Sequence, residues 1–366
     1  MYISLKQNGQ NIFVFHIKII YFDLKDIKVG FIEMRERIKK LTIKDIAKTA
    51  NVSTASVDRV INGRDGVKAS TREKVLSAID QLNRHSNTNK VKLTKIAFIV
   101  EAGPTFISLV EGAITAFIEE NEHEIEYSLD TLKTGHGSSQ DIAEIILKRA
   151  QEVDGIILMA ADSVPVNRAV NQAIEQHIPV ICLTSDLPNS NRTAYVGSDQ
   201  KSVGATAGYL LGRMLPRMPG RILFVASAPY DCQLQRELGF RQALRQEFPH
   251  LKIEECIHSQ DDSDYSYQSM LEFLKKDRHL DAVYNAAGGN RGIARALREH
   301  NLTRHVVFIG HEISSHTREL LDQREMDLVI GHDVEQEVKT AVNIIRHQQE
   351  QDCLSPISII TPYNAI

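Results

Sequence analysis

From residue 96 onward, short apolar segments alternate with longer stretches in which apolar residues recur at helical spacing. The apolar segments are Ile96–Val100, Gly155–Met159, Pro179–Leu183, Arg221–Val225, Asp281–Tyr284, Val306–Ile309 and Leu328–Ile330. The helical stretches include Leu109–Glu120, Asp141–Gln151, Ser202–Met214 and Gly292–His300. Short buried strands separated by amphipathic helices are typical of parallel βαβ sheets. Because the strands are too many for one comfortable doubly wound sheet, we predict an α/β protein of two similar lobes, with ligands at the carboxyl ends of strands.

A separate helical segment precedes this pattern. Residues 41–63, LTIKDIAKTANVSTASVDRVING, predict two helices joined by a tight turn at Ala50-Asn51-Val52-Ser53. Thr42 is the expected N-cap of the first helix, Ile43–Thr49, and Ser53 that of the second, which runs to about Ile61. The residues expected to pack these helices together are Ile46, Ala47, Val52, Val57 and Val60. A third helix, capped by Ser70, is expected to present Val75, Leu76, Ile79 and Leu82 on one face.

The second helix of this pair is expected to turn a polar face outward. That face carries Thr54, Ala55, Asp58 and Arg59. A helix fits the major groove of duplex DNA, where Arg binds guanine in bidentate fashion and Asp accepts from cytosine N4. The segment therefore predicts a helix-turn-helix that reads DNA, although spacing alone also allows a solvated three-helix bundle without a DNA role.

Charge is divided unevenly along the chain. Residues 34–95 hold 15 Lys and Arg against 6 Asp and Glu, a net charge of +9, whereas residues 96–366 carry a net charge of −14. A basic module attached to an acidic body indicates one part that binds a polyanion and another part with a different task.

Cysteine spacing and hydropathy indicate the cellular compartment of the protein. The four Cys residues are far apart and form no Cys-x-x-Cys pair, which favours buried free thiols over a disulfide framework or a zinc ribbon. No run of about 18 apolar residues occurs, so we expect no membrane span. The apolar run Ile12–Phe22 is a poor secretory signal, because His16 and Lys18 interrupt it. We therefore predict a cytoplasmic protein.

These patterns divide the chain into four segments. Residues 1–33 show no clean period, and Met34 opens a stretch that reads like a natural start, so we expect a non-native or disordered extension. Residues 34–83 are the predicted helix-turn-helix domain, and the polar, basic residues 84–95 are the predicted linker. The sensor spans residues 96–366, with one lobe at 96–199 and a return near 325–350, and a second lobe at 200–324.

The segment around the turn resembles the headpiece of the LacI/GalR family of transcription regulators, which ends in Val-Ser-Arg-Val-Leu-Asn. Here the corresponding residues are Val57-Asp58-Arg59-Val60-Ile61-Asn62. The resemblance implies that Thr54, Ala55 and Arg59 read bases, and that Thr42, Ser53, Ser56 and Asn62 contact phosphate or hold the fold. Asp58 replaces the usual Ser and is expected to shift operator preference, since an acid repels phosphate. The linker also lacks the Ala-x-x-Leu element with which hinge helices of the family wedge into the minor groove.

The sensor resembles the type I periplasmic sugar-binding proteins, in which a sugar lies between two lobes. Position by position, the resemblance implies ligand contacts from Asp186, Asn285, Glu312 and His332, and a stacking ring at Phe106. Arg236 matches a common structural Arg, and Leu234 stands where a ligand-gripping Arg is usual.

Together these features predict a homodimeric regulator, most simply a repressor. Two headpieces would read the half-sites of a near-palindromic operator, and a small sugar or polyol would change operator affinity. We expect no cofactor, no metal ion, no membrane contact and no catalysis. His311 and His316 are five residues apart, which does not fit the His-Glu-x-x-His zinc motif. A periplasmic-type solute-binding protein for transport or chemotaxis is the alternative.

Overall fold

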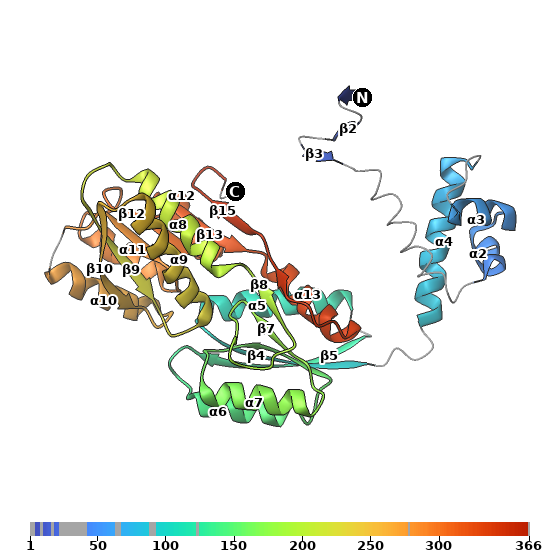
Figure 1. Ribbon diagram of the computed structural model, residues 1–366, viewed down its shortest axis with the longest axis horizontal. Helices are drawn as coiled ribbons and strands as arrows, with labels where there is room; N and C mark the ends of the chain where they lie inside the picture. Colours follow the sequence, from blue (N-terminus) through green and yellow to red (C-terminus); the bar gives the residue numbers. More distant parts are fainter. Residues whose placement is uncertain are drawn as a thin grey trace. The chain divides into compact units, whose positions relative to one another are not determined.

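In the computed structural model, the chain forms two compact units, Met1–Lys92 and Leu93–Ile366 (Figure 1). The structure describes residues 4–7, 10–15, 18–21, 42–62, 67–87, 93–121, 124–276 and 279–364. In the first unit, strands β1 (Ser4–Gln7), β2 (Gln10–Phe15) and β3 (Lys18–Tyr21) pair in order as an antiparallel sheet. That residues 1–33 are a non-native or disordered extension stays a prediction.

The helix-turn-helix follows in the same unit. Helix α2 (Ile43–Ala50) begins at Thr42, whose hydroxyl accepts a hydrogen bond from the Asp45 amide. Helix α3 (Thr54–Ile61) begins at Ser53 in the same way. Asn51 closes α2 in the left-handed conformation, with φ of 51°, which Asn tolerates better than most residues. The predicted caps and turn are thereby confirmed, as is burial of the core that includes Ile46, Ala47, Val57 and Val60, with Val52 packed against it.

The third helix differs from its prediction in three respects. Helix α4 spans Ala69–Asn87, so it runs further than the sequence pattern indicated, and Ser70 lies inside its first turn instead of capping it. Val75 and Ile79 are buried as expected, whereas Leu76 is 37% exposed. The side chain of Leu82 lies outside the described residues.

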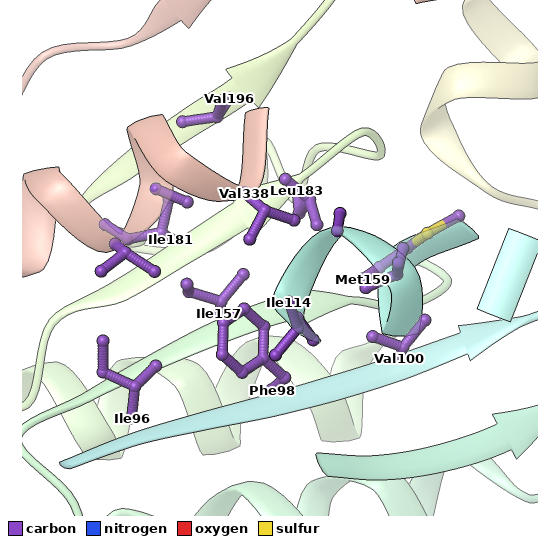
Figure 2. Close-up of a cluster of buried hydrophobic side chains, with 14 of the residues drawn as sticks. Ile96, Phe98, Val100, Ile114, Ile157, Met159, Ile181, Leu183, Val196 and Val338 are labelled. Carbon is purple, nitrogen blue, oxygen red and sulfur yellow. The ribbon is translucent and has the colours of Figure 1, made fainter. Parts of the chain in front are cut away.

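Lobe one of the second unit contains a six-stranded sheet in the order β14-β8-β7-β6-β4-β5, with all neighbours parallel. Its strands are β4 (Thr94–Ala102), β5 (Ile125–Lys133), β6 (Gly155–Met159), β7 (Val180–Leu183), β8 (Ala194–Gly197) and β14 (Cys353–Leu354). Helices α5 (Pro104–Glu120) and α13 (Val334–His347) pack on one face, and α6 (Ser139–Arg149) and α7 (Val164–Glu175) pack on the other. Figure 2 shows Ile114 and Val338 from the first pair of helices against the strand residues Phe98, Ile157 and Ile181.

Lobe two repeats this architecture. Its sheet order is β10-β9-β11-β12-β13-β15, and only the β13–β15 pair among these strands is antiparallel. The strands are β9 (Gly220–Ala226), β10 (Leu251–His258), β11 (Ala282–Asn285), β12 (Val307–His311), β13 (Leu328–His332) and β15 (Ile357–Ile360). The helices are α8 (Gln200–Met214) and α9 (Asp231–Glu247) on one face, and α10 (Ser263–Lys276), α11 (Asn290–Glu299) and α12 (Ser315–Asp322) on the other.

The chain crosses between the lobes three times. The crossings lie between β8 and α8, between β13 and α13, and between β14 and β15. Strand β13 therefore belongs to lobe two, so the return to lobe one begins at Val334 and not near residue 325. The two-lobed α/β fold is confirmed, as is the helical helix-turn-helix domain that precedes it.

Candidate functional site

The carboxyl ends of strands from both lobes meet around a cavity of about 760 Å³, its open mouth included. Lobe one contributes Phe106, which follows β4, Met159 at the end of β6 and Thr184 after β7. Lobe two contributes residues that follow β9, β10, β11 and β12. They include Tyr230, Gln233, Arg236, Asp261, Ala286, Asn290, His311 and Glu312. The location agrees with the expectation from parallel sheets, whose carboxyl ends form the natural crevice.

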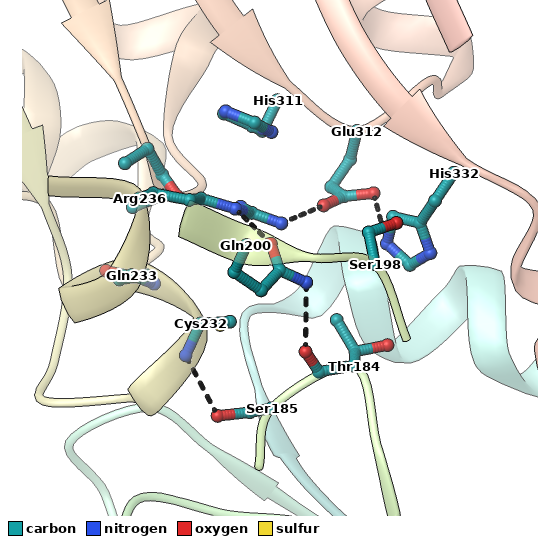
Figure 3. A network of polar contacts seen from close by, with 12 residues as sticks. Thr184, Ser185, Ser198, Gln200, Cys232, Gln233, Arg236, His311, Glu312 and His332 are labelled. Carbon is teal, nitrogen blue, oxygen red and sulfur yellow. Dashed lines mark hydrogen bonds and ion pairs between the residues drawn. The ribbon is translucent and has the colours of Figure 1, made fainter. Parts of the chain in front are cut away.

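A cluster of charged side chains lies at the wall of this cleft (Figure 3). Arg236 on α9 is buried and donates from Nε to Gln200 Oε1 at 2.8 Å and from Nη1 to the Ala286 carbonyl at 3.0 Å. Its Nη2 lies 3.6 Å from Oε1 of Glu312, and the other carboxylate oxygen of Glu312 lies 3.2 Å from Nε2 of His332. Glu312 is thus held between two cationic side chains.

Opposite charges determine the ionisation of this group. Burial of Glu312 opposes its charged form, yet the charges of His332 and Arg236 lower the pKa of Glu312 to about 2. Burial of His332 opposes its charge as well, yet Glu312 and Glu337 raise the pKa of His332 to about 10. At neutral pH the cleft therefore presents Glu312 as a carboxylate, which can only accept hydrogen bonds.

Two other ionisable groups at the cavity are neutral. Burial, together with the charge of Arg236, lowers the pKa of His311 well below its ordinary value, and Nε2 of His311 lies 2.9 Å from the Tyr284 hydroxyl. Burial raises the pKa of the Cys232 thiol to about 11. Neither residue adds charge to the cleft near neutral pH.

The backbone at the site is unusual at two positions. Thr184 and Glu312 have φ of 62° and 67°, in the left-handed region. This conformation is a genuine outlier for a β-branched residue such as Thr, and outliers of this kind concentrate at functional sites. The Thr184 carbonyl accepts hydrogen bonds from Tyr195 Oη at 3.0 Å and from Gln200 Nε2 at 3.1 Å, which hold it in place. Tyr195 and Gln200 therefore fix the backbone of Thr184 at the edge of the cavity.

Asp261 joins the lobes on the other side of the cavity. Its Oδ1 accepts from the Gly288 amide at 2.6 Å, and its Oδ2 accepts from the Thr134 hydroxyl in lobe one at 2.7 Å. The Thr134 hydroxyl also lies 3.1 Å from that of Tyr230 in lobe two. These contacts close one rim of the cleft.

Two of the five predicted ligand residues line the cavity, and a third, His332, lies next to them without lining it. Phe106 and Glu312 line the cavity. His332 lies directly behind Glu312, and its ring centroid is 6.1 Å from that of Phe106. The predicted stacking ring and the predicted acid therefore face one cavity, with His332 supporting the acid.

The other two predicted ligand residues do not line the cavity. Asn285 is buried and donates to the Gly288 carbonyl at 2.9 Å and to Asn290 Oδ1 at 2.8 Å, so it shapes the loop before α11. Asp186 is bound by the guanidinium of Arg192 and by the Leu187 amide. Both side chains are already occupied by protein partners, which corrects their predicted position in the cleft.

The sequence interpretation also missed residues that do line the cavity. Arg236 was assigned a structural role, yet it lies at the cavity wall. Asp261 and Gln233 were not singled out, because each belongs to a part of the chain with a weak secondary-structure signal.

In the amino-terminal unit, α3 presents Thr54, Ala55 and Arg59 to solvent, as predicted. Asp58 is half-buried instead of fully outward. The Asn62 side-chain amide donates to the Asp58 carbonyl at 2.9 Å and to its carboxylate at 2.8 Å. Ser53 and Ser56 are joined through their hydroxyls at 2.9 Å at the start of the helix. The exposed face is thus polar, with one Arg near the end of the helix.

The fold and the cleft define a class of protein, namely a two-lobed binding domain of the periplasmic type that carries an amino-terminal helix-turn-helix. A family model described as "Periplasmic binding protein domain" matches residues 96–351, and one described as "Bacterial regulatory proteins, lacI family" matches residues 42–87. The chain therefore belongs to the periplasmic binding protein domain family and is a DNA-binding transcription regulator of the lacI family. The resemblance drawn from the sequence is confirmed.

Known proteins similar to the chain agree with this assignment. It is 24% identical over 245 residues to the probable HTH-type transcriptional repressor ExuR of Bacillus subtilis (strain 168), covering 67% of this chain and 72% of that one. It is also 24% identical over 244 residues to catabolite control protein A of Priestia megaterium, covering 64% and 69%. Among solved structures, GanP, a glucose-galactose binding protein from Geobacillus stearothermophilus, superposes with a TM-score of 0.67 at 21% identity, covering 75% of this chain and 99% of that one.

Two further observations bear on the site and on membranes. In the part of the chain that the structure describes, no helix is both long and apolar enough to cross a bilayer. Within the same residues, no group of three or more His, Cys, Asp or Glu side chains is placed to hold a metal ion.

Proposed function

We propose that this regulator is a homodimeric repressor whose affinity for a near-palindromic operator changes when a small neutral sugar or polyol binds between the lobes. The observation that carries the proposal is the cleft itself. It presents an ionised Glu312 between two cations, a second carboxylate at Asp261 and the ring of Phe106. Carboxylates accept hydrogen bonds from hydroxyl groups, and an apolar wall with few convergent polar groups is typical of small-molecule sites.

Structures with this fold support the choice of ligand class. GanP is a glucose-galactose binding protein, and a solute-binding protein from Bacillus halodurans C-125 was solved with bound myo-inositol. Sugars and polyols are therefore the first compounds to test on this chain.

The helix-turn-helix supports a cytoplasmic regulator over the alternative of a transport or chemotaxis protein. We propose that Thr54, Ala55 and Arg59 read base edges, and that Thr42, Ser53 and Ser56 contact phosphates. Asp58 modulates operator preference and, with Asn62, fixes the end of the helix. Two copies of such a headpiece, related by two-fold symmetry, require an operator with two related half-sites.

A thermal-shift screen of the full chain tests the ligand class. The panel is D-glucose, D-galactose, D-arabinose, myo-inositol, sugar alcohols and phosphorylated sugars. A ligand at 100 times its Kd adds about 2.7 kcal/mol to the free energy of unfolding, which raises Tm by a few degrees. Stabilisation by a neutral sugar or polyol supports the proposal, whereas stabilisation by phosphorylated sugars alone, or by none of the panel, contradicts it.

A second measurement tests regulation and catalysis together. Operator DNA selected from random duplexes is titrated with the chain, with and without the compound found in the screen. We expect a change in operator affinity and recovery of the compound unchanged, because we assign the cleft a binding role without catalysis or a cofactor. Consumption of the compound would identify an enzyme instead.

A further inference from the structure

His332 lies between two carboxylates that come from different lobes. Its Nδ1 is 2.8 Å from Oε1 of Glu337 on α13, and its Nε2 is 3.2 Å from Oε2 of Glu312 after β12. The side chain of Glu337 is fully buried and that of His332 is only 3% exposed. Glu337 is not among the residues that line the cavity.

The chemistry of these three groups fixes the protons on the ring. An ionised carboxylate has no hydrogen to donate, so each ring nitrogen that faces one must carry its own. His332 is therefore an imidazolium: its Nδ1 donates to Glu337, and its Nε2 forms an ion pair with Glu312. The other charged group that faces Glu312 is Arg236, and the neighbouring His311 is neutral. Two carboxylates and two cations thus balance in a buried cluster.

Glu337 is also tied to lobe one through Thr184. The Thr184 hydroxyl donates to Oε2 of Glu337 at 3.2 Å. The carbonyl of the same residue accepts from Nε2 of Gln200, the first residue of α8, immediately after the first crossing between lobes. Gln200 in turn accepts from Arg236, which lies 3.6 Å from Glu312.

Together these contacts form a closed series of residues from both lobes, which we call the interlobe ring. The ring consists of Thr184, Glu337, His332, Glu312, Arg236 and Gln200. Gln200 follows the first crossing between the lobes, and His332 directly precedes the second. Glu312 is therefore connected through this ring to the residues that flank two of the crossings between the lobes.

We propose that Glu337 is a positioning residue of the effector site. Through His332 it holds the carboxylate of Glu312 in the cleft and ties this acceptor to the framework of lobe one. The inference rests on the proposed effector site, since Glu337 itself touches no ligand there. A buried carboxylate costs desolvation energy that ion pairing does not reliably recover, so its presence calls for a role beyond stability.

The test is nitrogen-15 NMR of the histidine rings in the full chain. Glu337→Gln keeps the shape and an acceptor oxygen but removes the charge. Glu335→Gln is the matched control, because Glu335 lies in the same first turn of α13 but is exposed. We expect the titration midpoint of His332 to fall by about 1–3 pH units in Glu337→Gln and to stay unchanged in Glu335→Gln. Equal midpoints in all three proteins would overturn the proposal.

Two further readouts cover the other outcomes. If Glu337→Gln fails to fold, the wild-type spectrum still tests the proposal, since a neutral His332 ring at pH 8 excludes the arrangement.

The second readout is the affinity for D-galactose, D-arabinose and myo-inositol. A compound that binds the wild type should bind Glu337→Gln about tenfold more weakly and Glu335→Gln equally well. If neither variant loses affinity, the positioning role is contradicted. If none of the probes binds the wild type, the sugar assignment fails, while the ring titration still tests Glu337.

Discussion

Asp186 is fastened to Arg192, six residues further along the chain. Both Nε and Nη2 of Arg192 donate to the Asp186 carboxylate, the latter at 2.7 Å, and Nη1 donates to Asp352 at 2.8 Å. Asp186 and Arg192 are each less than one fifth exposed. The pair therefore ties the connection between β7 and β8 to the segment before β14, and Asp186 has a structural task.

Replacement of Asp186 should consequently affect stability and spare ligand binding. Asp186→Asn removes the charge that the Arg192 guanidinium faces, and we expect the free energy of unfolding to fall by about 1–3 kcal/mol. Chemical denaturation followed by circular dichroism measures this, since the chain contains no Trp. Effector affinity of the folded variant should match the wild type, and a selective loss of affinity would return Asp186 to the binding site.

Glu312→Gln should show the opposite pattern. The substitution keeps the size of the side chain but removes the charged acceptor between Arg236 and His332. Hydrogen bonds to charged groups contribute about 1.5–3 kcal/mol, so we expect effector affinity to fall at least about tenfold. Isothermal titration of the compound found in the screen measures the change. An affinity equal to that of Asp186→Asn would contradict the assignment of Glu312 to the site.

These two acids show how far the sequence could locate the site. Each follows a buried strand, so position alone gave both the same expectation. What separates them is where each is paired, because Arg192 binds Asp186 away from the residues that line the cavity, whereas Arg236 and His332 hold Glu312 at the cavity wall. Such pairing depends on loop geometry, which no local pattern reports. Asn285 was misplaced for the same reason, since its amide is bound to the loop that follows it.

The fold was predictable where strands are buried on both sides. All seven apolar runs coincide with strands, because central parallel strands are apolar throughout. Strands β5 and β10 were missed, and both lie at sheet edges, where polar residues interrupt the pattern. Strands β8, β14 and β15 were missed as well, because they are only four, two and four residues long. Missing β10 also hid Asp261, which follows it. Helix α9 escaped notice because it buries Gln233 and Arg236 along with few large apolar residues.

The Glu312–His332 pair should give the sensor a pH-dependent stability with two limbs. The raised pKa of His332 means that its contribution is complete below pH 6.5 and is lost as the pH rises through about 10. The lowered pKa of Glu312 means that its contribution is complete above pH 4.5 and is lost as the pH falls through about 2. We expect the pair to stabilise the folded protein most between about pH 4.5 and about pH 6.5, where both contributions are complete. Denaturation midpoints from pH 3 to pH 9 check this, and Glu312→Gln should flatten both limbs.

Arg59→Ala should weaken operator binding at one position. Arg59 is exposed on α3, where a guanidinium can reach a guanine edge. We expect a loss of about 1–3 kcal/mol and relaxed preference at a single base pair. Fluorescence anisotropy with the selected operator and its single-base variants gives both quantities. Lys74→Ala on the exposed face of α4 is the control, and equal behaviour of the two variants would exclude base reading by Arg59.

The packing of α8 against α9 determines where Arg236 lies, and Gly204 tests that dependence. A Cβ at Gly204 would overlap the backbone carbonyl of Arg236, so Gly204→Ala must push α9 away from α8. Overpacking of this kind typically costs about 1–3 kcal/mol, and the displaced guanidinium should lower effector affinity as well. Gly112 on α5 provides the same substitution with nothing within 4 Å of the new methyl group. There we expect a gain of about 0.5–1 kcal/mol from helix propensity alone.

Denaturation midpoints and effector titrations of these two glycine variants separate the effects. If Gly204→Ala is as stable as Gly112→Ala, the close approach of the two helices is not present in solution. If Gly204→Ala is destabilised but binds the effector normally, α9 can shift without moving Arg236, and the cleft does not depend on this helix contact. A loss of both stability and affinity, confined to Gly204→Ala, is the outcome that the geometry predicts, because the carbonyl that the new methyl group would displace belongs to the residue that faces Glu312.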